Sequence, residues 1–221
     1  MNTKKYINTD IEPLAINDSP WCYEINENKN DFKDEKNIGK WMLFVPKDIF
    51  NEYWKNIRAL YNDKKLSDVV MLKCSTNYNN SRASDNNNGV ILLYCNNSSD
   101  RNYIIDIGIN ILKHIDCKQC VHINRPYIYY KSDEQTLKGT RQTGCNKNHL
   151  YKLNVMGSMC HYCDVELNEE YKMCDCHLCE DWGGCKRTEG YYILKCPKCR
   201  KDYEKTKIVE WNSRGRLKDY C

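Results

Sequence analysis

The chain has 221 residues, of which 41% are hydrophobic and 29% are charged, as in an ordinary globular protein. No apolar run approaches the roughly 20 residues that a transmembrane helix needs, and the polar start Met1–Lys5 is unlike a secretion signal. We therefore expect a cytoplasmic protein without a membrane partner. Because 34 basic residues nearly balance 30 acidic ones, the net charge of +4 permits contact with phosphates without requiring it.

The first 38 residues are polar, with one apolar island at Ser19–Ile25. There Trp21, Tyr23 and Ile25 occupy alternate positions, which is typical of a short, half-exposed strand. Residues 26–37 are charged and rich in asparagine. They predict a loop, with Phe32 alone in it as a large apolar side chain.

A compact apolar run at Trp41–Val45, ended by Pro46, predicts a strand buried on both faces. Asp48 is then a candidate N-cap for an amphipathic helix. The stripe of that helix, at i, i+3, i+4 and i+7, consists of Phe50, Tyr53, Trp54, Ile57, Leu60 and Tyr61. We expect the core to form around this strand and helix.

The rest of the first part alternates strands with one more helix. We predict strands at Val69–Cys74, Val90–Cys95, Tyr127–Lys131 and Leu150–Val155, and a helix capped by Asp100 with the stripe Ile104, Ile107, Ile111, Leu112 and Ile115. Polar loops are expected at 77–89 and from 132 to 148. Strands interrupted by two helices predict an α+β fold, in which helices back one face of a mostly antiparallel, curved sheet.

The composition changes after Gly157 to cysteine, tyrosine and charge. We therefore expect an N-terminal segment at 1–38, a core domain at 39–156 and a small cysteine-rich domain at 157–221.

Several pieces of the core domain occur in the order found in a known family. "GKW" at 39–41 opens a central strand, Trp54 lies within a helix, and "YIYYKSDEQTLKG" at 127–139 runs from a strand into a polar loop. Residues 39–155 resemble the cap-binding translation initiation factor 4E family. The sequence "YYKSD" at 129–133 also resembles the basophilic-leukaemia-expressed proteins, which share that fold without an established cap function.

The resemblance to the 4E family implies a protein that binds the 7-methylguanosine cap of mRNA and acts in translation initiation. Family members hold the methylated base between two aromatic rings, while a carboxylate bonds its edge and basic side chains hold the phosphates; stacking of a cation on aromatic faces explains the choice of residues. When these roles are carried over to this chain, the candidate stacking residues are Trp21 and Tyr94, and the candidate base-reading carboxylate is Glu24. The candidate phosphate contacts are Lys73, Lys131, Lys138 and Arg141.

Two alternatives stay open. Trp21 could belong to the core of the first strand, in which case Phe32 in the following loop would be the stacking residue. The fold could also serve a general RNA-binding or adaptor protein without cap specificity. The partners that the resemblance implies are capped mRNA and a scaffold initiation factor of the 4G type.

The C-terminal part carries two C-x-x-C pairs, Cys160 with Cys163 and Cys196 with Cys199. In a reducing compartment, four thiolates at this spacing are typical of a structural zinc site, and a small domain gains folding free energy from the metal. The chain is thus expected to hold one or two zinc ions, with a zinc-ribbon-like fold at 157–221.

A second zinc site is predicted between these pairs. Its candidate ligands are Cys174, Cys176, Cys179 and Cys185, and whether Cys176 or His177 coordinates stays open. A third set has suitable ligand types, although the resemblance places its halves at opposite ends of neighbouring strands; it consists of Cys117, Cys120, Cys145 and His149.

We find no phosphate-binding glycine loop, nucleophile elbow or HExxH motif, and expect a binding protein rather than an enzyme.

Overall fold

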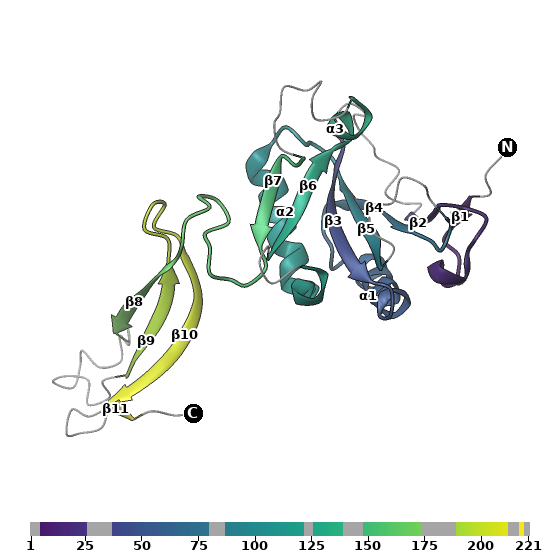
Figure 1. The fold of residues 1–221 in the computed structure, drawn as a ribbon. Coiled ribbons are helices and arrows are strands. Elements are labelled where there is room, and N and C mark those ends of the chain that lie inside the picture. The colour runs from purple at the N-terminus through teal and green to yellow at the C-terminus, as the bar shows by residue number, and fades with distance from the viewer. Residues whose placement is uncertain are drawn as a thin grey trace. The chain divides into compact units, whose positions relative to one another are not determined.

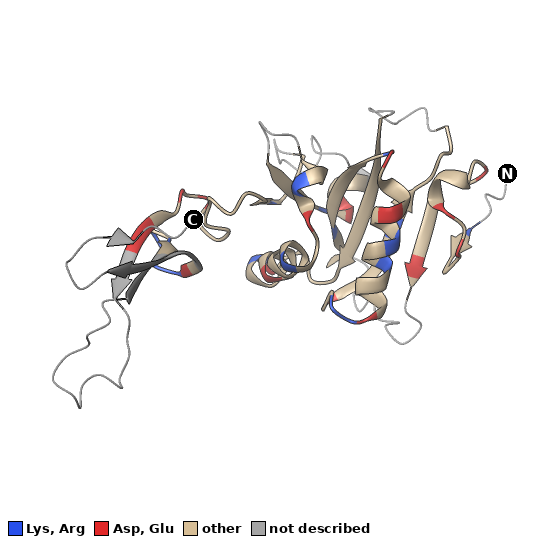
Figure 2. Cartoon of the chain, turned by 90° about the horizontal axis from the view of Figure 1, so that it is seen from below, with Lys and Arg blue, Asp and Glu red and all other residues tan. Residues whose placement is uncertain are grey.

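The computed structural model describes residues 5–25, 37–79, 87–121, 126–138, 148–173, 189–211 and 217–218. The chain divides into two compact units, residues 1–156 and 157–221, so the division falls where the composition changes. Acidic and basic residues are interspersed along the ribbon of the described residues (Figure 2). None of the helices in those residues is both long enough and apolar enough to cross a membrane.

The described part of the first unit forms a sheet of seven strands in the order β1-β2-β4-β5-β3-β6-β7 (Figure 1). Its pairs are antiparallel apart from the short parallel pair of β1 with β2. The strands are β1 (Tyr6–Ile7), β2 (Trp21–Ile25), β3 (Gly39–Pro46), β4 (Val69–Ser75), β5 (Asn88–Cys95), β6 (Tyr127–Ser132) and β7 (Tyr151–Asn154). The helices are η1 (Pro13–Ala15), α1 (Phe50–Asn62), α2 (Arg101–His114), η4 (Cys117–Cys120) and α3 (Asp133–Lys138).

Helices α1 and α2 lie on the same face of this sheet, behind the strands in the view of Figure 1 and below them in Figure 2. The core lies between the two layers, where Trp41 and Trp54 are fully or almost fully buried. A Cβ at Gly108 would lie 2.6 Å from the Trp41 ring and 2.4 Å from Leu153, so glycine lets α2 approach the sheet closely. The predicted α+β class, with a mostly antiparallel sheet backed by helices, is confirmed.

Most of the predicted elements occur within a residue or two of their expected bounds. Asp100 caps α2 by accepting a hydrogen bond from the backbone N–H of Tyr103 at 3.1 Å, as predicted. The N-cap prediction for Asp48 is wrong, because Ile49 occupies that position and the Asp48 carboxylate accepts from the N–H of Ile49 instead. The short helix α3 lies where a loop was expected, since its polar sequence carries no apolar periodicity.

The prediction that β3 is buried on both faces is also wrong. Trp41, Leu43 and Val45 point into the core, but Phe44 points to the opposite face and is 47% exposed. An unbroken apolar run therefore does not require two covered faces when the second face carries a surface of another kind.

The described part of the second unit contains a four-stranded sheet in the order β11-β10-β9-β8. Its strands are β8 (Asn168–Met173), β9 (Glu189–Lys195), β10 (Asp202–Trp211) and β11 (Leu217–Lys218). Both C-x-x-C pairs lie in turns next to this sheet, since the first precedes β8 and the second joins β9 to β10. This arrangement fits the small zinc-binding region that the sequence predicts.

Candidate functional site

The face of the first sheet that lies away from α1 and α2 is called the open face below. Residues opposite each other in an antiparallel pair point to the same face, so the register defines rows of side chains across the strands. One row runs through six strands and consists of Tyr23, Lys73, Leu92, Met42, Tyr129 and Lys152. The adjacent row consists of Ile25, Met71, Tyr94, Lys40 and Lys131. The open face thus combines lysines with aromatic rings.

The β2 end of the open face carries a cation over an aromatic ring. The Lys73 ammonium lies 4.1 Å from the centre of the Trp21 ring and 5.4 Å from that of Tyr23, both within the range of a cation–π contact. Burial lowers the pKa of Lys73, and the nearby Lys40 lowers it further. Trp21 is half-buried, and its ring is positioned to receive a positive charge.

Trp21 and Tyr94, the predicted stacking pair, are not opposite each other in the sheet. Trp21 is opposite Ser75 of β4, whereas Tyr94 is opposite Met71, so the two rings are offset by four residues along the strands. They are also two strands apart. This places their Cα atoms roughly 16 Å from each other. The Trp21 side chain nevertheless packs against the buried cluster that contains Tyr94.

Tyr94 itself is buried and packs in a cluster with Ile38 and Leu92. The Lys40 ammonium lies 5.5 Å from the centre of its ring. Lys40 in turn donates to the Asp133 carboxylate and, at 2.8 Å, to the Thr136 hydroxyl, which ties α3 to the open face. Tyr94 is thus buried in this structure, and its role as a stacking residue stays a prediction.

Glu24, the predicted base-reading carboxylate, does not share a face of the sheet with Trp21. Because residues alternate along β2, Glu24 points to the helix-covered face and Trp21 to the open face. Glu24 is 5% exposed and accepts hydrogen bonds from Arg58 Nε at 2.8 Å and from Asn62 Nδ2 at 3.0 Å. Its carboxylate is part of the packing of α1 against the sheet.

The remaining cap-site candidates have mixed outcomes. Lys73 and Lys131 both lie on the open face, as a phosphate-binding role requires. Phe32 and Arg141 lie outside the described residues, and of Lys138 the structure describes only its place at the end of α3.

Sequence reasoning missed the aromatic surface at the centre of the open face. Phe44 of β3 and the half-buried Tyr127 and Tyr129 of β6 all lie on it. The signal was present in "YIYYKS", where Ile128, Tyr130 and Ser132 are buried and the tyrosines between them are not. Only the pairing of β3 with β6 puts Phe44 on the same face as these tyrosines.

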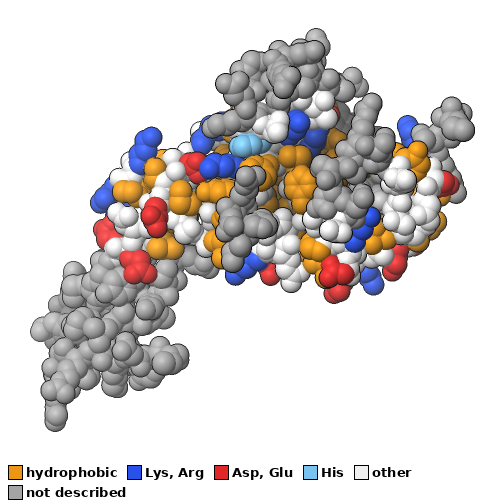
Figure 3. Space-filling model, in the orientation of Figure 1, with side chains coloured by type: hydrophobic (Ala, Val, Ile, Leu, Met, Phe, Trp, Pro, Cys, Tyr) orange, Lys and Arg blue, Asp and Glu red, His pale blue; other side chains and the backbone are white. Residues whose placement is uncertain are grey.

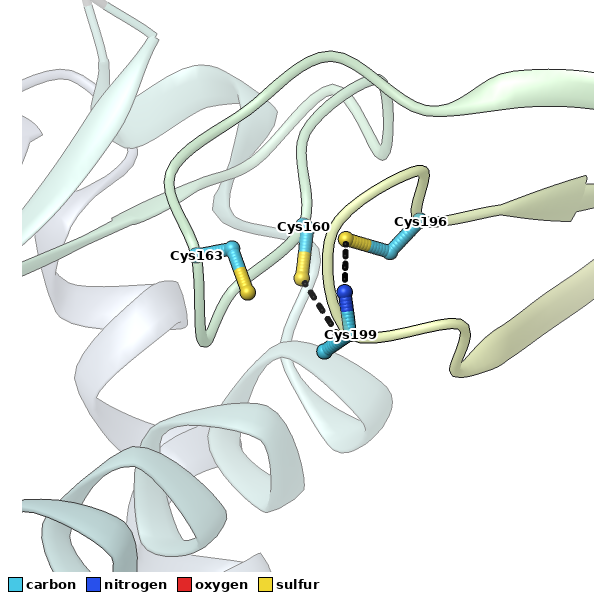
Figure 4. A group of neighbouring side chains, drawn as sticks. All are labelled: Cys160, Cys163, Cys196 and Cys199. Atoms are coloured by element: carbon cyan, nitrogen blue, oxygen red, sulfur yellow. Dashed lines mark hydrogen bonds between the residues drawn. The ribbon is translucent and has the colours of Figure 1, made fainter.

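The four cysteines of the second unit's C-x-x-C pairs meet in one cluster (Figure 4). Their sulfur atoms all lie within 4.8 Å of one another. The Sγ atoms of Cys160 and Cys199 are 3.7 Å apart. Four Zn–S bonds of about 2.3 Å in a tetrahedron would give S···S distances of about 3.8 Å. The cluster therefore fits a single tetrahedral metal ion, as predicted.

The two turns that present these cysteines have the same backbone hydrogen bonds. The Cys160 N–H donates to the Val165 carbonyl, and the Cys160 carbonyl accepts from the Asp164 N–H, each at 2.8 Å. Cys196 makes the corresponding bonds with Lys201 and Arg200, each at 3.0 Å. Asp164 and Arg200 both have a positive φ, which closes each turn.

Outer contacts orient the thiol groups. The Tyr203 hydroxyl donates to Cys160 Sγ at 3.1 Å, and the Cys199 N–H donates to Cys196 Sγ at 3.3 Å. Such bonds to metal-bound sulfur fix ligand orientation.

The other predicted metal sets are not found among the residues that the structure describes. The candidates Cys174, Cys176, His177, Cys179 and Cys185 lie outside those residues, as does Cys145. Cys117 and Cys120 are buried in η4, where Tyr53 of α1 donates to the Asp116 carbonyl. His149 packs on Tyr129 of the open face, with ring centres 4.8 Å apart, and forms no metal-binding group with Cys117 and Cys120 among the described residues.

Comparison with known proteins supports part of the sequence resemblance. Residues 30–137, just under half of the chain, match the model of the family described as basophilic leukemia-expressed protein Bles03. No curated protein matches the chain.

Among solved structures, the chain is similar to the complex of Ascaris suum eIF4E-3 with m2,2,7G cap, at 14% sequence identity and a TM-score of 0.33. The match covers 49% of this chain and 57% of that one. At this TM-score the two chains share too little to infer a common site.

Proposed function

We propose that the first unit binds RNA at the 7-methylguanosine cap of mRNA and acts in translation initiation, as a binding protein rather than an enzyme. The observation that supports this best is the Lys73 ammonium at 4.1 Å from the Trp21 ring centre. A ring that already accepts one cation offers the same attraction to 7-methylguanine, which is also a cation.

In this proposal Lys73 changes partners when the cap binds. The methylated base takes its place on Trp21, and the displaced ammonium turns to the cap phosphates, where a charge-assisted contact is available. Lys131 lies on the same face and adds positive charge. Phe32 stays a candidate for the second ring, and a scaffold initiation factor of the 4G type stays the proposed protein partner.

A second candidate function is RNA binding without preference for the methylated base. It is favoured by Glu24, whose carboxylate is engaged by Arg58 and Asn62 on the covered face instead of facing a base. It is also favoured by the burial of Tyr94.

The two candidates differ in their response to 7-methyl-GTP and GTP. Tryptophan fluorescence of the full chain is titrated with each nucleotide. Cap binding predicts saturable quenching that strongly favours 7-methyl-GTP and is lost in Trp21→Ala. Equal, weak responses to the two nucleotides would reject cap recognition and leave the second candidate.

For the second unit we propose that the cluster of Cys160, Cys163, Cys196 and Cys199 holds zinc. All-thiolate, tetrahedral sites that leave no coordination position open are typical of structural zinc. The ion would join two turns that are far apart in the sequence, and so stabilise a small domain.

A further inference from the structure

We propose that the open face carries a second nucleotide-binding position, formed by Phe44, Tyr127 and Tyr129 with Lys152, which binds the single-stranded RNA that follows the cap. This inference rests on the proposed function in one respect, namely that RNA is the ligand of the first unit. These four residues are called the central patch below.

Three rings and an amine come together in the central patch. The pairing of β3 with β6 ends with Met42 opposite Tyr129, and Phe44 follows two residues further along β3, on the same face as Met42. The ring centres of Tyr127 and Tyr129 are 6.5 Å apart. The Lys152 ammonium lies 4.2 Å from the centre of the Tyr127 ring. The patch thus repeats the lysine-over-aromatic arrangement of Trp21 and Lys73.

The exposure of Phe44 indicates a binding surface. This side chain is 47% exposed; it lies opposite Val90 of β5, two residues beyond the part of β3 that pairs with β6. A single exposed apolar residue would need no explanation, but here the half-buried Tyr127 and Tyr129 of the neighbouring strand lie on the same face. Figure 3, which views this face, shows hydrophobic side chains gathered over the strands of the first unit with lysine or arginine side chains among them.

The charge of the open face matches a phosphodiester chain. Lys73 and Lys152 lie in one row across the strands, and Lys40 and Lys131 lie in the next. Asp133 offsets the charge of Lys40. Among the residues that the structure describes, no carboxylate lies within 4 Å of the Lys73 or Lys131 amines. A protein partner would be favoured by a mainly apolar patch, whereas alternating amines and rings favour phosphates and bases.

The distance between the two positions suits successive parts of one strand. Trp21 and Phe44 are three strands apart in the sheet order, which corresponds to roughly 14 Å between their backbones. Lys73 of β4 lies between them. A capped RNA held at Trp21 can therefore extend across β4 and β5 to reach the central patch, with its phosphates near the lysines.

The test compares a ligand that reaches only the first position with one that reaches both. Binding of 7-methyl-GTP is measured by tryptophan fluorescence, and binding of a capped and an uncapped single-stranded oligonucleotide by fluorescence anisotropy, all with the full chain. The variants are Phe44→Ala, Phe44→Tyr and Lys152→Gln. Lys113→Gln is the matched charge control, because Lys113 is exposed on α2, which lies on the covered side.

We expect Phe44→Ala to weaken binding of the capped oligonucleotide roughly 5- to 150-fold, the range measured when one stacking ring is lost. Binding of 7-methyl-GTP should not change. Phe44→Tyr keeps a ring and should retain most of the affinity. Lys152→Gln should reduce the salt dependence by about one phosphate contact, a slope change of about 0.7 on logarithmic axes, while Lys113→Gln leaves it unchanged.

The results separate this inference from the cap proposal. Oligonucleotide binding that depends on Phe44, without any preference for 7-methyl-GTP over GTP, supports the central patch and rejects the cap. Unchanged oligonucleotide binding in Phe44→Ala, with 7-methyl-GTP still bound, overturns the central patch and leaves the cap. Absence of binding to any RNA overturns both and points to a protein as the ligand of this face. A thermal melt of each variant confirms that it is folded.

Discussion

Replacing Glu24 by glutamine should destabilise the first unit without weakening cap binding. The variant keeps the shape of the side chain but removes the buried carboxylate that lies 2.8 Å from Arg58 Nε, leaving the guanidinium only the exposed Asp10 carboxylate at 3.9 Å. Breaking a buried ion pair costs about 3–5 kcal/mol. Because the Arg58 side chain is 19% exposed and can regain some water, we expect a loss of about 2–3 kcal/mol. For a unit of this size that lowers the unfolding temperature by roughly 4–12 °C.

The assay is thermal unfolding of Glu24→Gln followed by circular dichroism, together with the 7-methyl-GTP titration. The control is Asp63→Asn, because the ion pair of Asp63 with Lys65 is exposed and such pairs contribute about 1 kcal/mol or less. Loss of nucleotide binding in Glu24→Gln with an unchanged unfolding temperature would refute our placement of this carboxylate. In the double variant with Arg58→Met, the two losses should be less than additive.

Three more predictions concern the metal, the core and the buried thiols. Cys160→Ser should lower the zinc content by one ion per chain, measured by mass spectrometry of the purified protein; an unchanged content would exclude the cluster as a zinc site. Gly108→Val should cost about 1–3 kcal/mol by overpacking α2 against Trp41 and Leu153, and a melting temperature equal to that of the parent chain would contradict this packing. Burial raises the pKa of Cys120 to about 11, above the roughly 8.5 of an unfolded chain. The folded state therefore keeps this proton longer, and the stability that it provides is complete below pH 8.5 and lost as the pH rises toward 11. Unfolding temperatures between pH 8 and 10.5 should fall less steeply in Cys120→Ala than in the parent chain, and equal slopes would contradict the assignment.

Local patterns were enough to predict most elements of the first unit. The alternation of Trp21, Tyr23 and Ile25 identified β2, and Asp100 with its following isoleucines identified α2 and its cap. These features depend on a few neighbouring residues and on the periods of strand and helix. The cysteine cluster could also be predicted, because each C-x-x-C pair forms its own turn and the two pairs have a common ligand chemistry.

The binding face could not be predicted in this way, because it depends on the order and register of the strands. Trp21 and Tyr94 both lie on the open face, yet the pairing of β2, β4 and β5 offsets them by four residues along the strands. Glu24 is only three residues from Trp21, but its side chain is on the other face and meets α1.

The sequence by itself determined most strands and the two long helices of the first unit, the place where the composition changes and which cysteines form the metal cluster. Tertiary structure alone decided that Phe44 is exposed on the same face as Tyr129, that Lys73 lies over Trp21 and that Lys40 is tied to Asp133. Periodicity tells which residues share a face of one strand. It cannot tell which strands become neighbours or which face the helices cover, because those outcomes depend on contacts between segments that are distant in the sequence.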